Sequence, residues 1–445
     1  PKDHHYQSPN YEFTTAKGAA QALCSPNSDA RYLAWMALHA MGITAEPALT
    51  PLLGDSNPRI RARAFWLLGQ LDGRESHYLE IALNDPAPNI RVTGLRLAAL
   101  FENDLPAVIN RLATDPSPHV RAECAVHLRH LEGPQADNAW AILASQHDGA
   151  DRWYLEALGI GATGNWDTRW AALEASNAKL SQTTQRDLIW RSRASISPTA
   201  LANLVLTADK DYDLRRYVRA LDFQPDTPSK RQALRDIAQA QHLSPEIALA
   251  ALTRLPDLSK ADSDIAKRLV SLLPQQAPSV ASMRLVKQLE AQGAYPWLLQ
   301  VAQSNHETRL EAITSLLDLQ QQPLLTQALG SQDLDKAQAT GIALAQAQRP
   351  DAFALIWPFI GNDRHHAAAR KATARETARF KLGAEQLLDR IEAGDFSEEL
   401  KQAVASTLLT HPDQAVRERA ERLFPLGNAI DAKPIPKLSA LLEQQ

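Results

Sequence analysis

The sequence predicts an all-α protein in which helix pairs stack side by side as a solenoid. Three observations predict this fold. A short segment occurs four times at a spacing of thirty residues, apolar residues follow each copy at helical spacing, and no run of residues has a convincing β-strand pattern. Because one helix pair cannot bury its apolar face alone, a fixed period of this size requires neighbouring pairs to pack against one another.

The repeated segment is a turn followed by the first residues of a helix. Asp-Pro or Ser-Pro within the turn disfavours the α conformation before the proline. A small polar residue then precedes Pro58 or Pro118, which is the pattern of an N-cap with proline at the first helical position. The copies align without a gap at residues 25–31, 55–61, 85–91 and 115–121.

Helical spacing continues after each turn. In the second copy, Ile60, Phe65 and Leu68 fall on one apolar stripe. Shorter apolar stretches, such as 47–53 and 105–113, lie between these helices and are expected to be the first helix of each pair. The repeating unit is therefore helix–turn–helix.

Two charged positions keep their phase through the copies and predict a ladder along the stack. We expect each aspartate to bond the amides of its turn and each arginine to bridge to the next repeat, which is a structural role. The alternative is a ridge that binds acids or phosphates. The expected ladder comprises Asp55, Asp85, Asp115, Arg31, Arg61, Arg91, Arg121 and Arg152.

Length and charge are consistent with a solenoid, which grows in one dimension and is not limited to a single core. The 445 residues carry a formal net charge of −4, which argues against a broad nucleic-acid footprint but allows a local basic patch. No apolar run is long enough for a membrane span, and no signal-peptide pattern is visible. A chain that starts at Pro1 is expected to be a mature, trimmed or excised piece.

A break at 225–228, rich in proline and aspartate, divides the chain. Within the second part, residues 367–393 read as one long helix rich in Ala, Arg and Glu. The predicted segments are a linker or docking arm at 1–18, regular repeats at 19–225, degenerate helical repeats at 226–425 and a tail at 426–445.

No catalytic, cofactor or metal site is predicted. The sequence lacks GxSxG, a Walker loop and a strand followed by GxGxxG. His127 and His130 could share a helix face, but no further ligand stands at metal-binding spacing. Cys24 and Cys124 form neither a CxxC zinc motif nor a CxxCH haem-attachment motif.

Aromatic residues and arginines gather between residues 150 and 193. Trp, Tyr and Arg dominate binding hot spots, so this cluster is a candidate interface with a partner or another domain. The other interpretation is a wide hydrophobic core between irregular repeats. The candidate interface residues are Trp153, Tyr154, Trp166, Trp170, Trp190, Arg191 and Arg193.

Together these segments resemble the HEAT-like middle region of large secreted, membrane-bound-dehydrogenase-type haem proteins of planctomycetes, verrucomicrobia and related bacteria. The resemblance is dense over about 20–225 and thin from there to about 425. It rests on residues 31–35, 61–69, 90–96, 117–125, 148–161, 190–193 and 216–223.

In that family a β-propeller resembling sugar (sorbosone-type) dehydrogenases precedes the helical region, and a cytochrome c domain with CxxCH follows it. This chain has neither, so the resemblance implies no haem and no catalytic residue here, although the parent protein could carry haem c. It implies an α-solenoid spacer, with a propeller and a cytochrome c domain as neighbours, in an extracytoplasmic location.

Three functions follow as hypotheses. The first is the non-catalytic spacer just described. The second is a free-standing module that binds a peptide or protein on its concave face. The third, a HEAT-like lyase acting on a tetrapyrrole, would need convergent Asp, Glu or His, which the periodicity does not offer. Neither nucleic-acid binding nor membrane insertion is expected.

Overall fold

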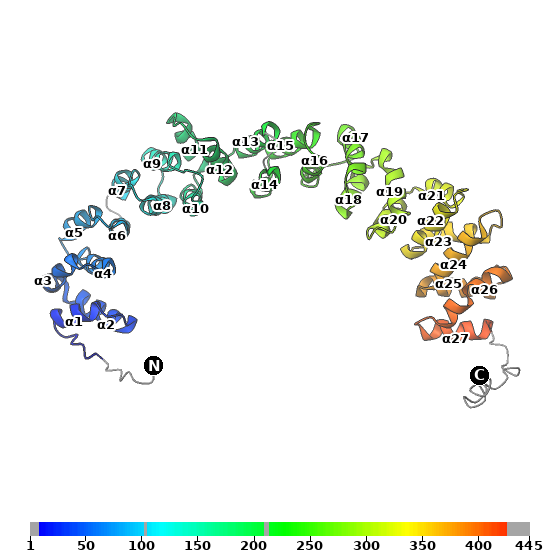
Figure 1. The fold of residues 1–445 in the computed structure, drawn as a ribbon, viewed down its shortest axis with the longest axis horizontal. Helices are drawn as coiled ribbons and strands as arrows, with labels where there is room; N and C mark the ends of the chain where they lie inside the picture. The colour runs from blue at the N-terminus through cyan, green and yellow to red at the C-terminus, as the bar shows by residue number, and fades with distance from the viewer. Residues whose placement is uncertain (1–8, 102–104, 209–212, 425–445) are drawn as a thin grey trace, which may run out of the picture. The chain divides into compact units, whose positions relative to one another are not determined.

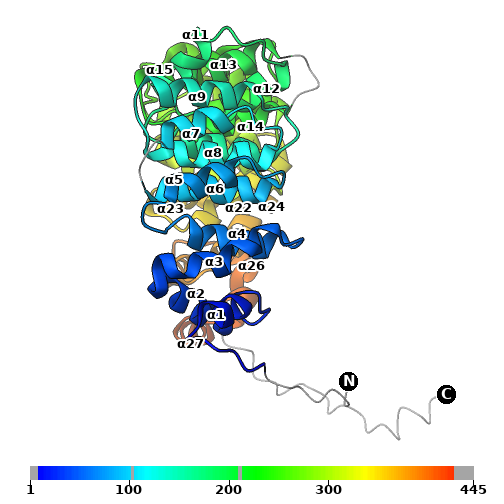
Figure 2. The same cartoon turned by 90° about the vertical axis from the view of Figure 1, so that its left-hand side faces the viewer.

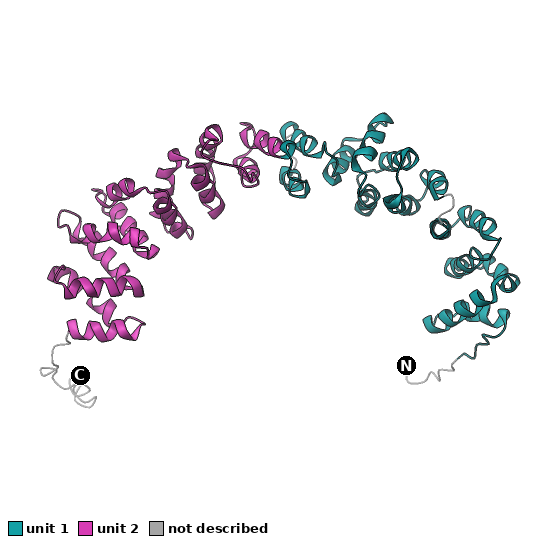
Figure 3. Cartoon of the chain, turned by 180° about the vertical axis from the view of Figure 1, so that it is seen from behind, with its two compact units in different colours: residues 1–230 teal, residues 231–445 magenta. Residues whose placement is uncertain are grey.

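The computed structural model describes residues 9–101, 105–208 and 213–424, and Figure 1 shows them as helices joined by short connections. Within these ranges no residue lies in a strand. The predicted all-α fold is confirmed. The chain divides into two compact units, residues 1–230 and 231–445, and Figure 3 colours them separately.

Unit 1 is built from the repeats that the sequence predicts. Its α-helices are α1 (Ala16–Leu23), α2 (Ser28–Met41), α3 (Glu46–Leu49), α4 (Pro58–Leu68), α5 (Glu75–Leu83), α6 (Pro88–Leu100), α7 (Leu105–Leu112), α8 (Pro118–His127), α9 (Pro134–Ser145), α10 (Arg152–Gly161), α11 (Trp166–Ala175), α12 (Gln182–Arg191), α13 (Ser197–Thr207) and α14 (Leu214–Ala220). Short 3-10 helices are η1 (Gly42–Ala45), η2 (Thr50–Gly54), η3 (Leu128–His130) and η4 (Leu221–Phe223).

The helices of unit 1 form two layers, which Figures 1 and 2 show from two sides. The even-numbered helices contact one another in series from α2 through α14. In the second layer, α7 contacts α9 and α9 contacts α11. Helices that follow each other in the chain, such as α5 and α6, join the layers. We call the series from α2 to α14 the even layer.

The helix starts follow the predicted capping chemistry. The Asn57 side chain accepts the backbone N–H of Arg59 at 3.0 Å, and Pro58 takes the first helical position. Asp151 caps α10 by accepting the N–H groups of Trp153 and Tyr154. These caps satisfy backbone donors that have no partner inside the helix, so each turn fixes where the next helix begins.

The core of unit 1 lies between the two layers. Trp140 is fully buried there, and its Nε1 donates to the carbonyl of Leu158 at 2.9 Å. The Trp166 ring packs edge-on against it, with 5.9 Å between ring centroids. Each such aromatic side chain removes a large apolar area from water, which stabilises the stack by about 2 kcal/mol or more.

Unit 2 repeats the architecture with less regular sequence. The helix α15 (Pro228–Gln239) spans the boundary between the units. The others are α16 (Pro245–Leu252), α17 (Ser263–Leu272), η5 (Leu273–Gln275), α18 (Val280–Leu289), η6 (Gln292–Ala294), α19 (Tyr295–Ala302), α20 (Arg309–Asp318), α21 (Gln322–Leu329), α22 (Leu334–Ala347), α23 (Pro350–Gly361), α24 (Ala367–Ala378), α25 (Lys381–Glu392), α26 (Glu398–Leu409) and α27 (Gln414–Leu423). Again alternate helices contact one another, from α18 through α26 in one layer.

The single long helix predicted at 367–393 is wrong, because the chain turns between α24 and α25. Phe380 takes an extended backbone (φ −111°, ψ 139°) and ends the run. Gly383 then lies so close to the end of α24 that an added Cβ would stand 2.3 Å from the carbonyl oxygen of Thr377. Only glycine permits this approach, so α25 packs back against α24.

The segment boundaries differ from the prediction at the N-terminus. The first helix begins at Ala16, inside the arm predicted at 1–18, and Thr15 caps it by accepting the N–H of Gly18 at 3.2 Å. The units meet at Lys230 and Arg231, near the break predicted at 225. Residues 1–8 of the predicted arm, and the tail predicted at 426–445, lie outside the described residues.

Candidate functional site

The turn aspartates organise the starts of the regular repeats. Asp55, Asp85 and Asp115 each accept the backbone N–H two residues later, at 2.7, 2.7 and 2.8 Å. This side-chain bond closes a tight turn and leads the chain into the next helix.

The turn arginines bind backbone as well as carboxylate. Arg31, Arg61, Arg91 and Arg121 each donate from Nη1 to the carbonyl six residues earlier, at 3.1, 2.9, 2.9 and 2.7 Å. These bonds pin each guanidinium to its own turn, so these four arginines have structural partners.

Two rungs of the ladder join successive repeats. Arg61 donates to Asp85 at 3.3 Å, and Arg91 makes two bonds of 2.7 Å to Asp115. Among the described residues Arg31 has no such carboxylate partner, and Arg121 instead lies 5.5 Å from the centre of the Tyr154 ring. Only the arginines of the second and third copies therefore bond to the aspartate of the next copy.

Arg152 does not continue the ladder, and its place there was predicted wrongly. It is the first residue of α10, whereas the ladder arginine Arg121 lies inside the first turn of α8, which begins at Pro118. Arg152 therefore points elsewhere: it pairs with Glu156 at 2.7 Å, and its side chain is 63% exposed. The turn before α10 is longer than its predecessors, which shifts the phase.

In that longer turn Asp148 accepts the N–H of Ala150 at 2.9 Å, as the turn aspartates do, and a histidine stands beside it. His147 is buried, and its Nε2 lies 3.1 Å from Oδ2 of Asp187, whose other oxygen accepts from Arg216 at 2.8 Å. Near the end of unit 2, His411 does the same work as the turn aspartates, since its Nδ1 accepts the N–H of Asp413 at 3.0 Å. Residues 411–413 and Arg417 resemble the repeated segment in sequence. His147 could not be found in this way, because it lies at no multiple of thirty residues from the turn aspartates.

The predicted aromatic interface separates into core and surface. Tyr154 and Trp166 are buried, with 2% and 8% of their surface exposed. Trp170 and Trp190 are partly buried against the same core. Trp153 alone of the five projects outward, at 83% exposure. The five rings therefore do not form one contact surface.

A groove on the even layer brings Trp190 together with arginines from three helices. Its volume is about 810 Å³, and its walls come from α10, α12, α14 and the segments that follow α12 and α14. We call it the arginine groove. It is lined by Arg152, Glu156, Trp190, Arg191, Arg193, Asp213, Arg215, Arg216, Arg219, Ala220 and Phe223.

The arginine groove is strongly cationic in a chain that is weakly acidic. Six arginines and two carboxylates line it, a formal excess of four positive charges, while the whole chain has a net charge of −4. Low-dielectric walls around charges of one sign focus the field and attract oppositely charged ligands. The sequence-based argument allowed a local basic patch, and the structure locates one.

Trp190 is the centre of the arginine groove. The guanidinium carbons of Arg152 and Arg216 lie 4.9 and 4.6 Å from the centre of its ring. Arg216 is oriented in turn by its bond to Asp187. Cation–π contacts of this kind hold the two guanidiniums in place, and 63% and 41% of the two side chains stay exposed to a ligand.

Glu156 anchors the opposite wall. Arg191 donates to it at 2.8 Å, and Gly159 lies so close to the Arg191 guanidinium that an added Cβ would stand 2.2 Å from its central carbon. Burial raises the pKa of Glu156, but the hydrogen bonds from Arg152 and Arg191 outweigh burial and the pKa is lowered. Glu156 is therefore ionised and fixes two of the six arginines.

Two arginines in the groove have no carboxylate partner within the described part of the chain. Arg193 is half-buried, donates to the carbonyl of Ser192 at 2.6 Å and lies 5.4 Å from the Phe223 ring centre. Burial, followed by the nearby charge of Arg191, lowers the pKa of Arg193. Arg219 is exposed. These two guanidiniums have most of their donors available to a bound molecule.

A second cavity, of about 540 Å³, lies on the same layer between α2, α4 and α6. Tyr32, 62% exposed, lines it with Trp35 and Trp66. Its arginines are engaged: Arg63 donates to the carbonyl of Leu23 at 2.9 Å, and Arg96 pairs with Glu123 at 2.7 Å. More aromatic side chains line this cavity than line the arginine groove, and its arginines are already held by the bonds just given.

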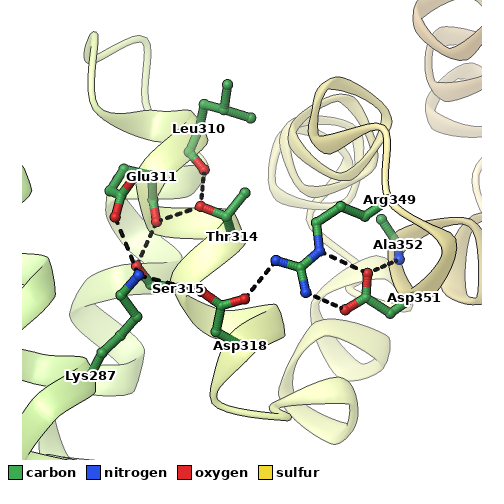
Figure 4. Close-up of polar contacts among 9 residues, drawn as sticks. All are labelled: Lys287, Leu310, Glu311, Thr314, Ser315, Asp318, Arg349, Asp351 and Ala352. Carbon is green, nitrogen blue, oxygen red and sulfur yellow. Dashed lines mark hydrogen bonds and ion pairs between the residues drawn. The ribbon is translucent and has the colours of Figure 1, made fainter.

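Unit 2 contains a charged network whose members satisfy one another (Figure 4). Lys287 of α18 lies 3.4 Å from Glu311 and 3.3 Å from Asp318, both on α20. Arg349, just before α23, donates to Asp318 at 2.6 Å and to Asp351 at 3.0 and 2.8 Å. The network ties successive repeats together. Both of its cations are paired with carboxylates, which makes it a structural counterpart of the unit 1 ladder.

The described residues hold no group of three or more His, Cys, Asp and Glu placed to bind a metal ion. As a separate finding, none of the described helices combines the length and apolar character that crossing a membrane requires. Cys24 is partly buried and Cys124 is buried, and both are free thiols.

Fold and groove place the chain in the class of α-solenoids built from helical repeats, which agrees with the sequence prediction. No protein-family model matches the chain, and no curated protein matches it. Among known structures it is similar to a homology model of the full-length AP-3 complex in an intermediate open conformation, at 12% identity and a TM-score of 0.35, over 92% of this chain and 80% of that one.

Two further known structures are similar to this chain. The UNC-45 chaperone, described as binding and folding muscle myosin, is 15% identical with a TM-score of 0.27, over 91% of this chain and 55% of that one. An engineered protein is 16% identical with a TM-score of 0.18, over 92% and 97%. At identities and TM-scores this low, the similarities carry no conclusion about function.

Proposed function

We propose that this chain is a non-catalytic protein-interaction scaffold and that the arginine groove is its main binding surface. The observation that carries the proposal is the convergence of six arginines on one groove, two of them, Arg193 and Arg219, without a carboxylate partner among the described residues. Arginine and tryptophan are the residue types that contribute most to protein interfaces.

The fold supports a binding role in a second way. Stacked repeats present a long, continuous surface whose side chains stand on helices and so keep fixed positions. In the arginine groove three helices of the even layer contribute to a single concavity. A partner segment laid along it would meet side chains from successive repeats at once.

Chemical crosslinking in the native cell, followed by reconstitution, tests the scaffold proposal. The crosslinked partner would be identified, purified and mixed with the full chain, and the mass of the complex measured by light scattering. We expect a complex of defined stoichiometry. A chain that stays monomeric with every captured protein, and that turns over a substrate by itself, would contradict the proposal.

We further propose, on the sequence resemblance alone, that the native protein is an extracytoplasmic redox protein in which this solenoid separates a propeller dehydrogenase from a cytochrome c domain. An intact mass and a visible spectrum of the protein isolated from its native cell test this role. A mass well above that of these 445 residues, with the Soret band of a c-type haem, is expected. A mass equal to that of these residues, with no visible band, would refute it.

A further inference from the structure

We infer that the arginine groove binds a carboxylate-rich protein segment, an extended stretch with several Asp or Glu side chains. This inference rests on the proposed scaffold function and names the chemistry of the partner. Charge complementarity carries it: the residues lining the groove of about 810 Å³ have an excess of four positive charges, and Asp187, which pairs with Arg216, offsets only one of them. A partner must supply negative charge to bury these groups without leaving them unpaired.

The groove contains guanidiniums of two kinds: exposed ones that an internal carboxylate orients, and a half-buried one. Arg152 and Arg216 are oriented by internal partners, Glu156 and Asp187, yet 63% and 41% of their side chains remain exposed. Arg193 adds a half-buried guanidinium beside them. A guanidinium has five N–H donors in a planar fork that matches a carboxylate with two parallel bonds. Successive Asp or Glu side chains of a partner would accept hydrogen bonds from the remaining N–H donors of these oriented guanidiniums.

The aromatic rings argue for a peptide over a single-stranded nucleic acid. Bases are held by stacking on open aromatic faces. Here the guanidiniums of Arg152 and Arg216 already lie over the ring of Trp190, and that of Arg193 lies over Phe223. Beyond the groove the chain is acidic overall, which would repel a long polyanion but not a short acidic segment.

Fluorescence anisotropy with the full chain and a labelled synthetic peptide of alternating Glu and Gly tests this inference. The matched peptide has Gln in place of Glu, and an unlabelled oligothymidylate serves as competitor. We expect the Glu peptide to bind, its affinity to fall as salt rises, and the Gln peptide to bind at least tenfold more weakly.

Two charge-reversal variants locate the binding. Arg219→Glu reverses the charge of an exposed groove residue. It should weaken binding of the Glu peptide by about tenfold or more and leave the helical circular-dichroism spectrum unchanged. Arg129→Glu, at an exposed arginine of η3 that does not line the groove, is the control and should bind like the parent chain.

Three outcomes would overturn the inference: no difference between the Glu and Gln peptides, equal losses in the two variants, or displacement of the peptide by oligothymidylate at a lower concentration than by unlabelled Glu peptide. The last result would assign the groove to phosphate chains. The scaffold proposal is judged separately: if the crosslinked partner still forms its complex with the Arg219→Glu chain, the scaffold stands and the arginine groove is not its docking site.

Discussion

Arginine does two different jobs in this chain, and its neighbours decide which. In the regular turns each arginine is tied to backbone carbonyls, and Arg61 and Arg91 also reach the next repeat's aspartate. In the arginine groove the guanidiniums rest on aromatic rings and keep exposed edges. The first arrangement stabilises the fold, and the second leaves N–H donors available to a partner.

The bond between Arg91 and Asp115 should be the most costly rung to break. Asp115 has a side chain only 4% exposed and two bonds from Arg91, so Asp115→Ala leaves a buried guanidinium unpaired and should lower the free energy of unfolding by about 3 kcal/mol. Asp55→Ala removes only the turn bond and should cost about 1 kcal/mol. Urea unfolding followed by circular dichroism measures both, and equal losses would contradict the ranking.

Glu123 should make the stability depend on acid pH. The imidazole of His127, 3.6 Å away, lowers its pKa, burial opposes this, and the hydrogen bond from Arg96 lowers it further, so that the pKa falls from 4.5 to about 2. A carboxyl whose pKa is depressed in the folded state stabilises the fold above its unfolded pKa, and that stability is lost as the pH falls toward the folded value. The loss should therefore occur between about pH 4.5 and about pH 2.

Unfolding by urea across this pH range measures the effect. Glu123→Gln should flatten the fall in stability between about pH 4.5 and about pH 2, since the substituted side chain does not titrate there. Glu132→Gln, at an exposed glutamate in the same repeat, should leave the slope unchanged. An unaltered slope in the Glu123→Gln chain would contradict the prediction.

At the residue scale the sequence revealed the regular repeats and missed positions where another side chain takes over. The period of thirty located the arginines of the first four turns and the aspartates of the second, third and fourth. It misplaced Arg152, because the turn before α10 is longer and the helix starts at that residue. It also gave no sign of His147, because a buried imidazole bonded to Asp187 has no counterpart in the four regular turns. The groove could not be predicted, because it brings Arg193, in the segment after α12, to the same cavity as Arg216 of α14.

At the element scale, close helix packing depends on small residues at the crossing points. Gly161, at the end of α10, lies against α8 so closely that an added Cβ would stand 2.1 Å from the carbonyl oxygen of Ala125. Backbone cannot yield as a flexible side chain can, so any larger residue must push the two helices apart. A glycine at a helix end is visible in the sequence, but whether it serves as a cap or as a contact is decided by the neighbouring helix.

Gly161→Ala should therefore destabilise unit 1 by about 2 to 3 kcal/mol, although alanine favours helix more than glycine does. Gly54→Ala is the matched control: no atom lies within 4 Å of a Cβ built there, so it should be neutral or slightly stabilising. Urea unfolding measures both chains. If Gly161→Ala is as stable as the parent chain, α8 and α10 do not pack as closely as the structure shows.

The break between α24 and α25 illustrates what limits prediction of elements. Residues 367–393 contain strong helix formers and no proline, so local propensity favours one helix. The turn arises because α24 and α25 gain contacts by packing against each other, with Ala378, Leu387 and Leu388 fully buried. That gain belongs to tertiary structure and overrides the local preference.

At the scale of the whole molecule, each extensive helix contact joins helices that are near neighbours in the chain. In unit 2, for example, α22 contacts α20, α21, α23 and α24. Stability in such an arrangement is a sum of repeat terms and nearest-neighbour terms, so the chain is expected to lose structure locally before it unfolds globally. The two compact units follow the same rule, each with its own internal contacts.

Leu344→Ala tests this local character. Leu344 is fully buried in α22, so its truncation should remove about 2 to 5 kcal/mol from the local stability. Native-state hydrogen exchange read by mass spectrometry should show the lost protection in α20 to α24 and unchanged protection in α2 to α10. The control Leu334→Ala, at the 38% exposed first residue of the same helix, should change little. A uniform loss across both units would mean that all repeats unfold as one cooperative body.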